Sequence, residues 1–240
     1  MDGKILIAAT TNKHKITEIS AIARAYGLTV VSRAEAGIPD FEIEETGDTF
    51  EENSFLKAKA IFDLTGRPTI ADDSGLAVDA LHGAPGVFSA RFADPDSDLA
   101  DFQAADREMA VAAAVMATAA ADTAAAASGP YARGRQDLAN NAKLLRLLAD
   151  VPAAARAARF VSVITLLAPG GDTAVCRGEV EGHIAFAQSG DAGFGYDPLF
   201  VPLGYRTTFG LFSPEEKNKI SHRSRALAAL REKLASSPGV

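Results

Sequence analysis

The chain has 240 residues, of which 48% are hydrophobic and 23% charged, so it can bury an ordinary globular core and is not disordered overall. The formal net charge of −7 argues against a protein that coats nucleic acid non-specifically, although a local group of cations or a metal ion can still attract a small anionic substrate. The single cysteine, Cys176, excludes an internal disulfide and a cysteine-based zinc site, and its strand-like setting predicts a buried, unreactive thiol.

No segment predicts a signal peptide or a membrane span. The apolar stretch near the N-terminus is too short for a signal peptide, and charge follows it at once. The apolar run at 109–127 is mostly alanine, which enters lipid only weakly, and it contains Asp122. We therefore expect a soluble, cytoplasmic protein that binds neither membrane nor nucleic acid.

The first 32 residues predict a strand, a loop, a helix and a second strand. Residues 4–9 (KILIAA) form a continuous apolar run typical of a strand buried on both faces. Apolar residues then recur at helical spacing from Ile16 to Tyr26, and Gly27 is placed to end the helix. With a second strand at 28–32, this order predicts an α/β sheet whose first loop lies at the carboxyl end of a strand.

The next segment is acidic from residue 40 to 52 and ends in a capping box, Thr49 with Glu52. A helix should follow, with its inner face formed by residues at helical spacing: Leu56, Ala60, Ile61 and Leu64. A brief strand at 67–71 leads into ADDSG, residues 71–75. The same letters are typical of surface turns, so an acidic turn is the alternative to a catalytic centre here.

The second half predicts an antiparallel pair of strands at 159–168 and 173–182, joined by a tight turn, and a further strand at 198–202. Ser213 begins a helix with Pro at its first position, and a final helix from about Ser221 places Leu227, Leu230 and Leu234 inward. Between the halves, the alanine-rich residues 94–135 are interpreted as a surface insertion, helical and then flexible around 128–130, within a single domain of residues 1–240.

Two groups of charged residues are candidates for anion binding and metal binding. In TTNKHK (residues 10–15), Lys13 and Lys15 stand where a helix begins; this makes sense if an anion binds there, although two solvated lysines are the alternative. Glu44 with Glu45 and Asp72 with Asp73 offer the oxygen ligands that Mg²⁺ prefers. Because neighbouring strand residues point to opposite faces, only one aspartate should face the cleft, and the other should brace the turn. A solvated acidic loop remains the alternative for the two glutamates.

Two later motifs suggest a nucleotide site. GFGYDPLF (193–200) alternates glycine with aromatic residues, so that a flat ligand can approach a ring; a structural aromatic turn is the alternative. EEKNKISHRSRA (215–226) concentrates basic groups beside two helix starts, and the alternative is a solvated basic face. Those basic groups are Lys217, Lys219, His222, Arg223 and Arg225.

Together these residues resemble a known family, the non-canonical purine nucleoside triphosphate pyrophosphatases of the RdgB type, also called inosine triphosphatases. The resemblance runs in order over most of the chain, through five motifs at 10–15, 44–60, 71–93, 193–200 and 213–227. It implies an elongated mixed α/β sheet flanked by helices, in two lobes with a central active-site cleft, and a homodimer. The implied reaction is Mg²⁺-assisted hydrolysis of ITP, dITP and XTP to the monophosphate and pyrophosphate.

The resemblance also implies residue roles. Asp73 would be the general base and a metal ligand, with Glu44 as its metal partner, and Ser74 would touch the substrate. The triphosphate would be held by Thr10, Thr11, Asn12, Lys13, His14, Lys15 and Lys57. The base and sugar would be met by Phe194, Gly195, Tyr196, Asp197, Lys217, His222 and Arg223. Hydrogen-bond donors on His222 and Arg223 would select a 6-oxo purine over adenine.

Two departures leave rival interpretations open. The alanine-rich segment replaces a shorter link, and Leu211 stands where the family commonly has a glutamate, which puts the geometry around Lys217 in question. A nucleotide-binding module without activity is one rival. A pyrophosphatase of the Maf type, acting on modified pyrimidine or methylated nucleotides, is the other.

Overall fold

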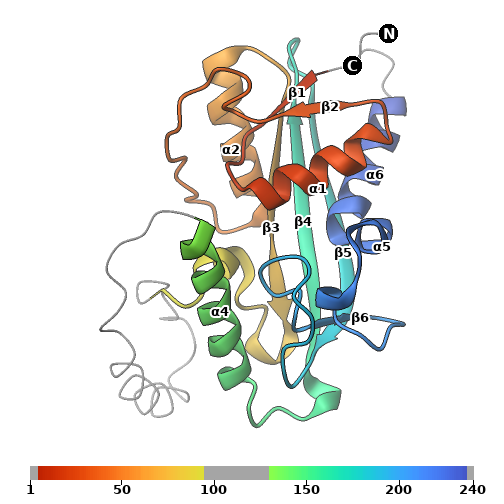
Figure 1. Ribbon diagram of the computed structural model, residues 1–240. Helices are drawn as coiled ribbons and strands as arrows, with labels where there is room; N and C mark the ends of the chain where they lie inside the picture. Colours follow the sequence, from red (N-terminus) through yellow and green to blue (C-terminus); the bar gives the residue numbers. More distant parts are fainter. Residues whose placement is uncertain (1–4, 95–129, 237–240) are drawn as a thin grey trace.

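The computed structural model describes residues 5–94 and 130–236, which form a mixed α/β architecture around one six-stranded sheet (Figure 1). The strand order is β2-β1-β3-β4-β5-β6. β1 pairs in parallel with both β2 and β3, and the remaining neighbours are antiparallel. The strands are β1 (Ile5–Ala8), β2 (Thr29–Val31), β3 (Thr69–Val78), β4 (Ala157–Leu167), β5 (Thr173–Ile184) and β6 (Phe200–Pro202). The predicted mixed sheet and the antiparallel β4–β5 pair are confirmed.

Helices cover both faces of the upper part of the sheet. α2 packs on β3 and β4 on one face of the sheet. α6 packs on β4 and β5 on the opposite face, where it also contacts α1. Strand alternation divides the two layers: Ile70 packs with the α1 and α6 residues, and Ala71 packs with α2. The helices are α1 (Lys13–Arg24), α2 (Phe50–Thr65), α4 (Pro130–Leu147), α5 (Pro214–Ile220) and α6 (His222–Ser236), with short 3-10 segments at η1 (Asp79–Leu81), η2 (Gly86–Arg91), η4 (Ala153–Ala155) and η5 (Phe209–Leu211).

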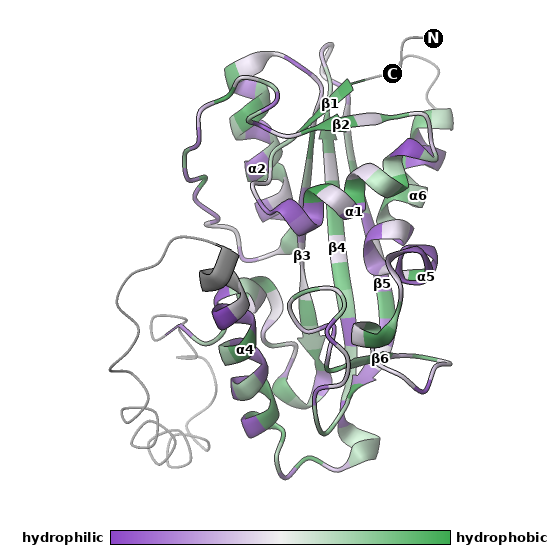
Figure 2. Ribbon diagram, in the orientation of Figure 1, coloured by the Kyte–Doolittle hydropathy of each residue, from purple (hydrophilic) through white to green (hydrophobic). Residues whose placement is uncertain are grey.

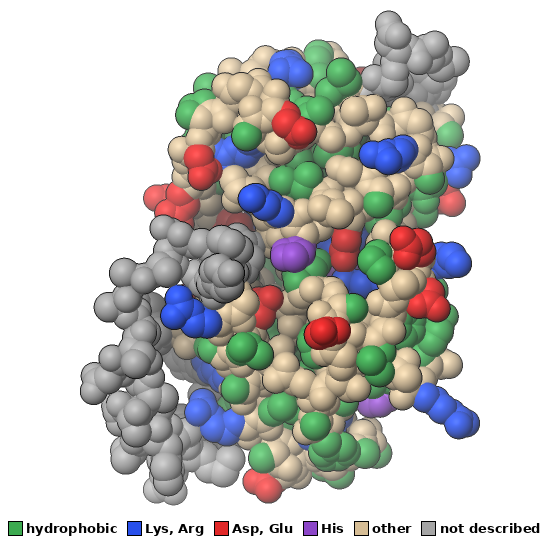
Figure 3. Space-filling view, viewed as in Figure 1, with side chains coloured by type: hydrophobic (Ala, Val, Ile, Leu, Met, Phe, Trp, Pro, Cys, Tyr) green, Lys and Arg blue, Asp and Glu red, His purple; other side chains and the backbone are tan. Residues whose placement is uncertain are grey.

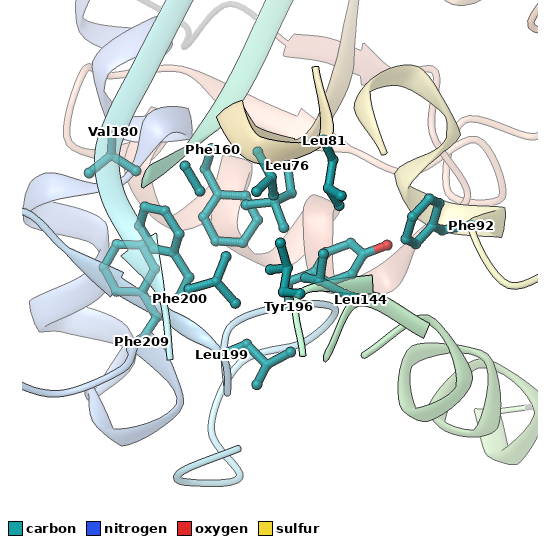
Figure 4. Packing of buried hydrophobic residues seen from close by; sticks show 14 of the residues in the cluster. Leu76, Leu81, Phe92, Leu144, Phe160, Val180, Tyr196, Leu199, Phe200 and Phe209 are labelled. Atoms are coloured by element: carbon teal, nitrogen blue, oxygen red, sulfur yellow. The ribbon is translucent and has the colours of Figure 1, made fainter. Parts of the chain in front are cut away.

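The three long strands β3, β4 and β5 connect an upper lobe to a lower lobe (Figure 1). The lower lobe has its own aromatic core, in which Phe160, Phe200 and Phe209 meet Leu76 and Tyr196 (Figure 4). The strands are largely hydrophobic, but the beginning of α1 and most of α5 are hydrophilic (Figure 2). On the surface, charged and histidine side chains gather at mid-height between the lobes (Figure 3). The predicted two-lobed shape is confirmed.

Local signals place the helix starts as expected. The Asn12 side chain accepts hydrogen bonds from two backbone N–H groups of α1, and the capping boxes at Thr49 and Ser213 are both formed. The inner face of α2 differs from the prediction, because Leu64 is 58% exposed while Ser54 and Lys57 are buried. This helix turns polar residues inward because they meet polar partners on β3 and β4.

The segment ADDSG is not a turn at the end of a strand. It lies within β3, which runs from Thr69 to Val78 and pairs with β4 along its whole length. Gly75 serves close packing: a Cβ there would come within 2.3 Å of Ser89 Oγ and 2.4 Å of the Gly86 carbonyl oxygen. Two adjacent carboxylates can occupy a buried strand here because cations from other elements reach both of them.

Most of the predicted insertion, residues 95–129, lies outside the described residues. Its predicted end at Arg135 falls inside α4, which begins at Pro130, so the last residues of the segment are helical. Cys176 is buried and free, as predicted. Across residues 5–94 and 130–236, no helix combines the length and the apolar character needed to cross a membrane.

The packing of α6 on β5 requires a glycine, which gives a test of the fold. A Cβ at Gly178 would lie 2.3 Å from both Ala226 N and the His222 carbonyl oxygen, so Gly178→Ala should lower the free energy of unfolding by about 1–3 kcal/mol. Gly134→Ala in α4 is the control, because a Cβ there has open space and should stabilise the helix by up to about 1 kcal/mol. Urea unfolding measures both; equal stability of the two variants would contradict the packing.

Candidate active site

Two adjoining cavities lie between the lobes. The larger has a volume of about 590 Å³ and the smaller about 270 Å³. Asn12, Lys15, Ser74 and Ala90 line both, so the start of α1, the middle of β3 and η2 form their common wall. A ligand of two chemically different parts can therefore occupy one continuous space.

A carboxylate paired with a lysine lines the smaller cavity. Lys57 Nζ lies 2.6 Å from Asp73 Oδ1 and 3.3 Å from Glu45 Oε1. The other oxygen, Asp73 Oδ2, is buried and has no hydrogen-bond partner among the residues that the structure describes. Burial raises the pKa of Asp73, and the charges of Lys57 and Lys15 counter part of that rise. This free carboxylate oxygen is the feature most suited to accept a proton or bind a cation.

Asp72 points to the opposite face of β3 and forms ion pairs instead of bracing a turn. Its carboxylate lies 2.9 Å from Lys15 Nζ and 3.2 Å from Arg223 Nη2, and it accepts a hydrogen bond of 2.6 Å from Ser162 Oγ. Burial would raise its pKa, but the charges of Arg223 and Lys15 outweigh burial and hold the pKa of Asp72 well below its usual range. The expected division of the two aspartates between faces is confirmed, while the turn-bracing role is wrong.

A chain of ion pairs continues from Arg223 across the molecule. Glu18 of α1 accepts hydrogen bonds from Arg223 Nη1 and from Lys217 Nζ, the latter at 2.7 Å. Lys217 Nζ is also 2.7 Å from Asp197 Oδ2. The sequence analysis missed Glu18, and its place on the inner face of a helix beside a charged loop is the only hint that the sequence offers. Leu211 is 54% exposed, and Lys217 is held without any carboxylate at that position.

The larger cavity has an aromatic wall. Phe194 belongs to the loop before β6, where Asp197 Oδ2 accepts a hydrogen bond from its backbone N–H at 2.9 Å. The ring of His14 stacks on Phe194 with 5.3 Å between centroids, and Lys217 Nζ lies 4.9 Å from the Phe194 centroid. The ring is thus held in a fixed orientation at the edge of the cavity.

His222 and Arg223, the first two residues of α6, form the cationic and hydrogen-bonding wall of the larger cavity. Burial, together with the nearby charges of Arg223 and Lys217, lowers the pKa of His222 well below its usual value, so the imidazole is neutral at pH 7. Its Nδ1 is buried and has no hydrogen-bond partner, and its ring stacks on Phe160 at 4.9 Å. A buried ring nitrogen without a partner, beside a cavity, is suited to bind a polar ligand edge.

Helix α4 holds the aromatic loop, which the sequence analysis did not anticipate. Asp137 Oδ2 accepts a hydrogen bond of 2.9 Å from the Gly195 N–H, and Asn141 Nδ2 donates one of 3.0 Å to the Gly195 carbonyl. Tyr196 Oη donates to the Ser89 carbonyl at 2.9 Å. Both backbone polar groups of one loop residue are therefore fixed from the same helix.

Of the residues singled out from the sequence, most line one or both cavities. The smaller cavity takes Thr10, Thr11, Lys57 and Asp73, and the larger takes Phe194, Gly195, Tyr196, Asp197, Lys217, His222 and Arg223. Asn12, Lys15 and Ser74 line both. Lys13 and Glu44 are exposed and line neither, and His14 meets the site only through its stack on Phe194.

The residues at the smaller cavity fit a hard divalent cation. Asp73 Oδ2 is free, and Glu45 lines the same cavity. In the part of the chain that the structure describes, no three histidine, cysteine or carboxylate side chains are grouped as a metal site. Mg²⁺ needs only one or two carboxylates, because it keeps waters and takes substrate phosphate oxygens as its other ligands.

Comparison with known proteins decides the family. Residues 6–130 and 124–233 match the model of the Ham1 family. The chain belongs to the Ham1 family. A dITP/XTP pyrophosphatase of Lactiplantibacillus plantarum is 41% identical over 230 residues, covering 95% of this chain and 94% of its own. One of Nitratidesulfovibrio vulgaris is 42% identical over 231 residues, with the same coverage.

Solved structures agree with this membership. The Ham1 protein of Staphylococcus aureus superposes with a TM-score of 0.71 at 34% identity, over 97% of this chain and 99% of that one. The dITP/XTP pyrophosphatase of Mycobacterium abscessus gives a TM-score of 0.63 at 37% identity, over 94% and 98%. The family resemblance carried by the five sequence motifs is confirmed.

The buried pair of Asp72 and Arg223 should dominate the stability of this Ham1 protein. Arg223→Met leaves the Asp72 carboxylate buried with Lys15 as its remaining cation, and this should cost about 3–5 kcal/mol in the free energy of unfolding. Arg225→Met, two residues on and exposed, is the control and should change stability much less. Chemical denaturation checks both, and near-equal midpoints would refute the importance of the pair.

Proposed function

We propose that this Ham1 protein is a nucleoside triphosphate pyrophosphohydrolase that converts dITP, ITP and XTP to the monophosphate and pyrophosphate. The observation that carries the proposal is the joining of two cavities at Asn12, Lys15 and Ser74, one aromatic and one with a free carboxylate oxygen. Their chemistry suits a purine nucleotide with its base against Phe194 and its phosphates beside Asp73. The relatives named dITP/XTP pyrophosphatase support dITP and XTP as substrates.

Asp73 is the proposed general base. Its free Oδ2 would take a proton from a water whose oxygen attacks the α-phosphorus, while the bond from that phosphorus to the bridging oxygen breaks and pyrophosphate leaves. Lys57 holds the other carboxylate oxygen at 2.6 Å and so fixes the direction of Oδ2. Lys15 lines both cavities, so it would face the middle of the phosphate chain.

Mg²⁺ is the proposed cofactor. When bound, it offsets phosphate charge in the transition state. Asp73 Oδ2 and Glu45 are the oxygens at the smaller cavity that suit it. The resemblance predicts that Glu44 binds the metal together with Asp73. Glu44 is exposed and lines neither cavity in this structure, so its role stays a prediction.

Selection for a 6-oxo purine would come from the donors at the start of α6. Arg223 lines the larger cavity, and His222 beside it has a ring nitrogen with no partner among the described residues. A 6-amino group would leave a donor unpaired, at a cost of roughly 1–3 kcal/mol for each donor. The hold of α4 on Gly195 keeps Phe194 and Tyr196 in place for stacking on the base.

The resemblance also supports a homodimer acting in the cytoplasm, and both belong to this proposal. Exposed apolar side chains at Tyr205 and Leu211 line one surface hollow at η5 and offer a surface for a second copy. They are part of the lower lobe, away from both cavities.

A substrate panel tests the activity. With Mg²⁺, purified protein should release pyrophosphate from dITP, ITP and XTP much faster than from ATP or GTP, and EDTA should stop the release. Equal turnover of ATP and ITP would contradict the specificity, and nucleotide binding without pyrophosphate would favour the inactive module. Preference for modified pyrimidine or methylated nucleotides would favour the Maf-type alternative.

Asp73→Asn tests the base. It should lower kcat by about 10²–10⁴-fold, because the amide cannot take the proton from water, and it should lower the melting temperature less than Asp72→Asn does, because Lys57 keeps Glu45 as an anion. Asp72→Asn is the matched comparison: it should lower the melting temperature, because Arg223 and Lys15 lose their shared anion. Turnover of Asp73→Asn at close to the normal rate would remove Asp73 from the mechanism.

A further inference from the structure

The smaller cavity contains positive charge beyond the two lysines that line it, Lys15 and Lys57. Lys15 is already paired with Asp72, and Lys57 with Asp73 and Glu45. Two arginines also line this cavity, Arg33 and Arg91. Within residues 5–94 and 130–236, neither arginine forms an ion pair.

Arg33 is a buried charge without a counter-charge in the described part of the chain. Its side chain is 5% exposed, and Nη2 donates to the carbonyls of Pro39 and Phe41 at 3.1 and 3.0 Å. The guanidinium lies 4.2 Å from the centroid of Phe41, while its Nε is buried with no hydrogen-bond partner. Buried charges in folded proteins are normally paired, so a guanidinium that lines a cavity without a counter-charge among the described residues is suited to bind an anion.

Arg91 approaches the cavity from the other lobe. It ends η2, whereas Arg33 belongs to the loop that follows β2 in the upper lobe (Figure 1). Its guanidinium lies 5.3 Å from the centroid of Phe88, and the side chain is half-buried. The two arginines thus belong to segments on different sides of the cavity.

Neither arginine lines the larger cavity, so both lie at the end of the site away from Phe194. We infer that Arg33 and Arg91 bind the terminal β- and γ-phosphates of the substrate and hold them as the leaving pyrophosphate. This inference rests on the proposed function, and it separates the lysines near Asp73 from the arginines at the far end. A planar guanidinium suits this task because its parallel N–H groups match two phosphate oxygens at once.

Calorimetric titration of the full chain with inorganic tripolyphosphate, in the presence of Mg²⁺, tests the inference without turnover. Arg91→Gln should weaken the Kd for tripolyphosphate about tenfold to a hundredfold, as expected for the loss of charge-assisted hydrogen bonds. Arg33→Gln should act in the same direction. Arg91→Lys should recover part of the affinity, and the exposed Arg67→Gln should leave it unchanged.

Titration with dIMP distinguishes the loss of a phosphate contact from general disruption of the site. The arginines do not line the larger cavity, so the Kd for dIMP should stay within about twofold of the wild-type value. Arg33→Gln also removes hydrogen bonds to two backbone carbonyls and could change the loop itself. Arg91→Gln makes no such change, so it provides the independent test. An unchanged tripolyphosphate Kd in folded Arg91→Gln overturns the inference even if dITP is hydrolysed. Loss of tripolyphosphate affinity in that variant upholds the arginine site even if the wild type hydrolyses no nucleotide.

Discussion

The site depends on the ion pair between Asp72 and Arg223 at the centre of the molecule. It places a carboxylate inside a ten-residue strand and joins that strand to the first turn of α6. Through Glu18 the same arginine is connected to Lys217 of α5, and through Lys217 to Asp197 of the aromatic loop. Because removing one member of a buried pair leaves an uncompensated charge, these elements are constrained to keep their relative positions.

Strand alternation gives the two neighbouring aspartates different environments. Asp72 faces α1 and α6, where cations surround it and hold its pKa low. Asp73 faces α2, where Lys57 occupies one carboxylate oxygen and the other stays free. A structural anion and a reactive carboxylate thus lie side by side because the backbone turns successive side chains to opposite faces.

The division of the site into two cavities suits a ligand with an aromatic end and an anionic end. Phe194, His222 and Arg223 form the first, with the loop held by α4 through Gly195. The second is formed by lysines paired with carboxylates and by arginines that have no carboxylate partner within residues 5–94 and 130–236. An acidic protein, with a formal net charge of −7, can therefore present a locally positive surface to phosphates.

The sequence by itself determined the order of most elements, the capping residues Thr49 and Ser213, and the five motifs that carry the family, because these depend on local spacing and composition. Only the tertiary structure decided that ADDSG lies within a strand, that Leu64 is exposed while Lys57 is buried, and that Glu18 and Asn141 support the site. Those outcomes depend on partners more than 15 residues away, such as Asp73 for Lys57, Arg223 for Asp72 and Gly195 for Asn141. Local propensity cannot reveal a buried charge's partner, since that partner is brought to it by the sheet and by the helices packed across it.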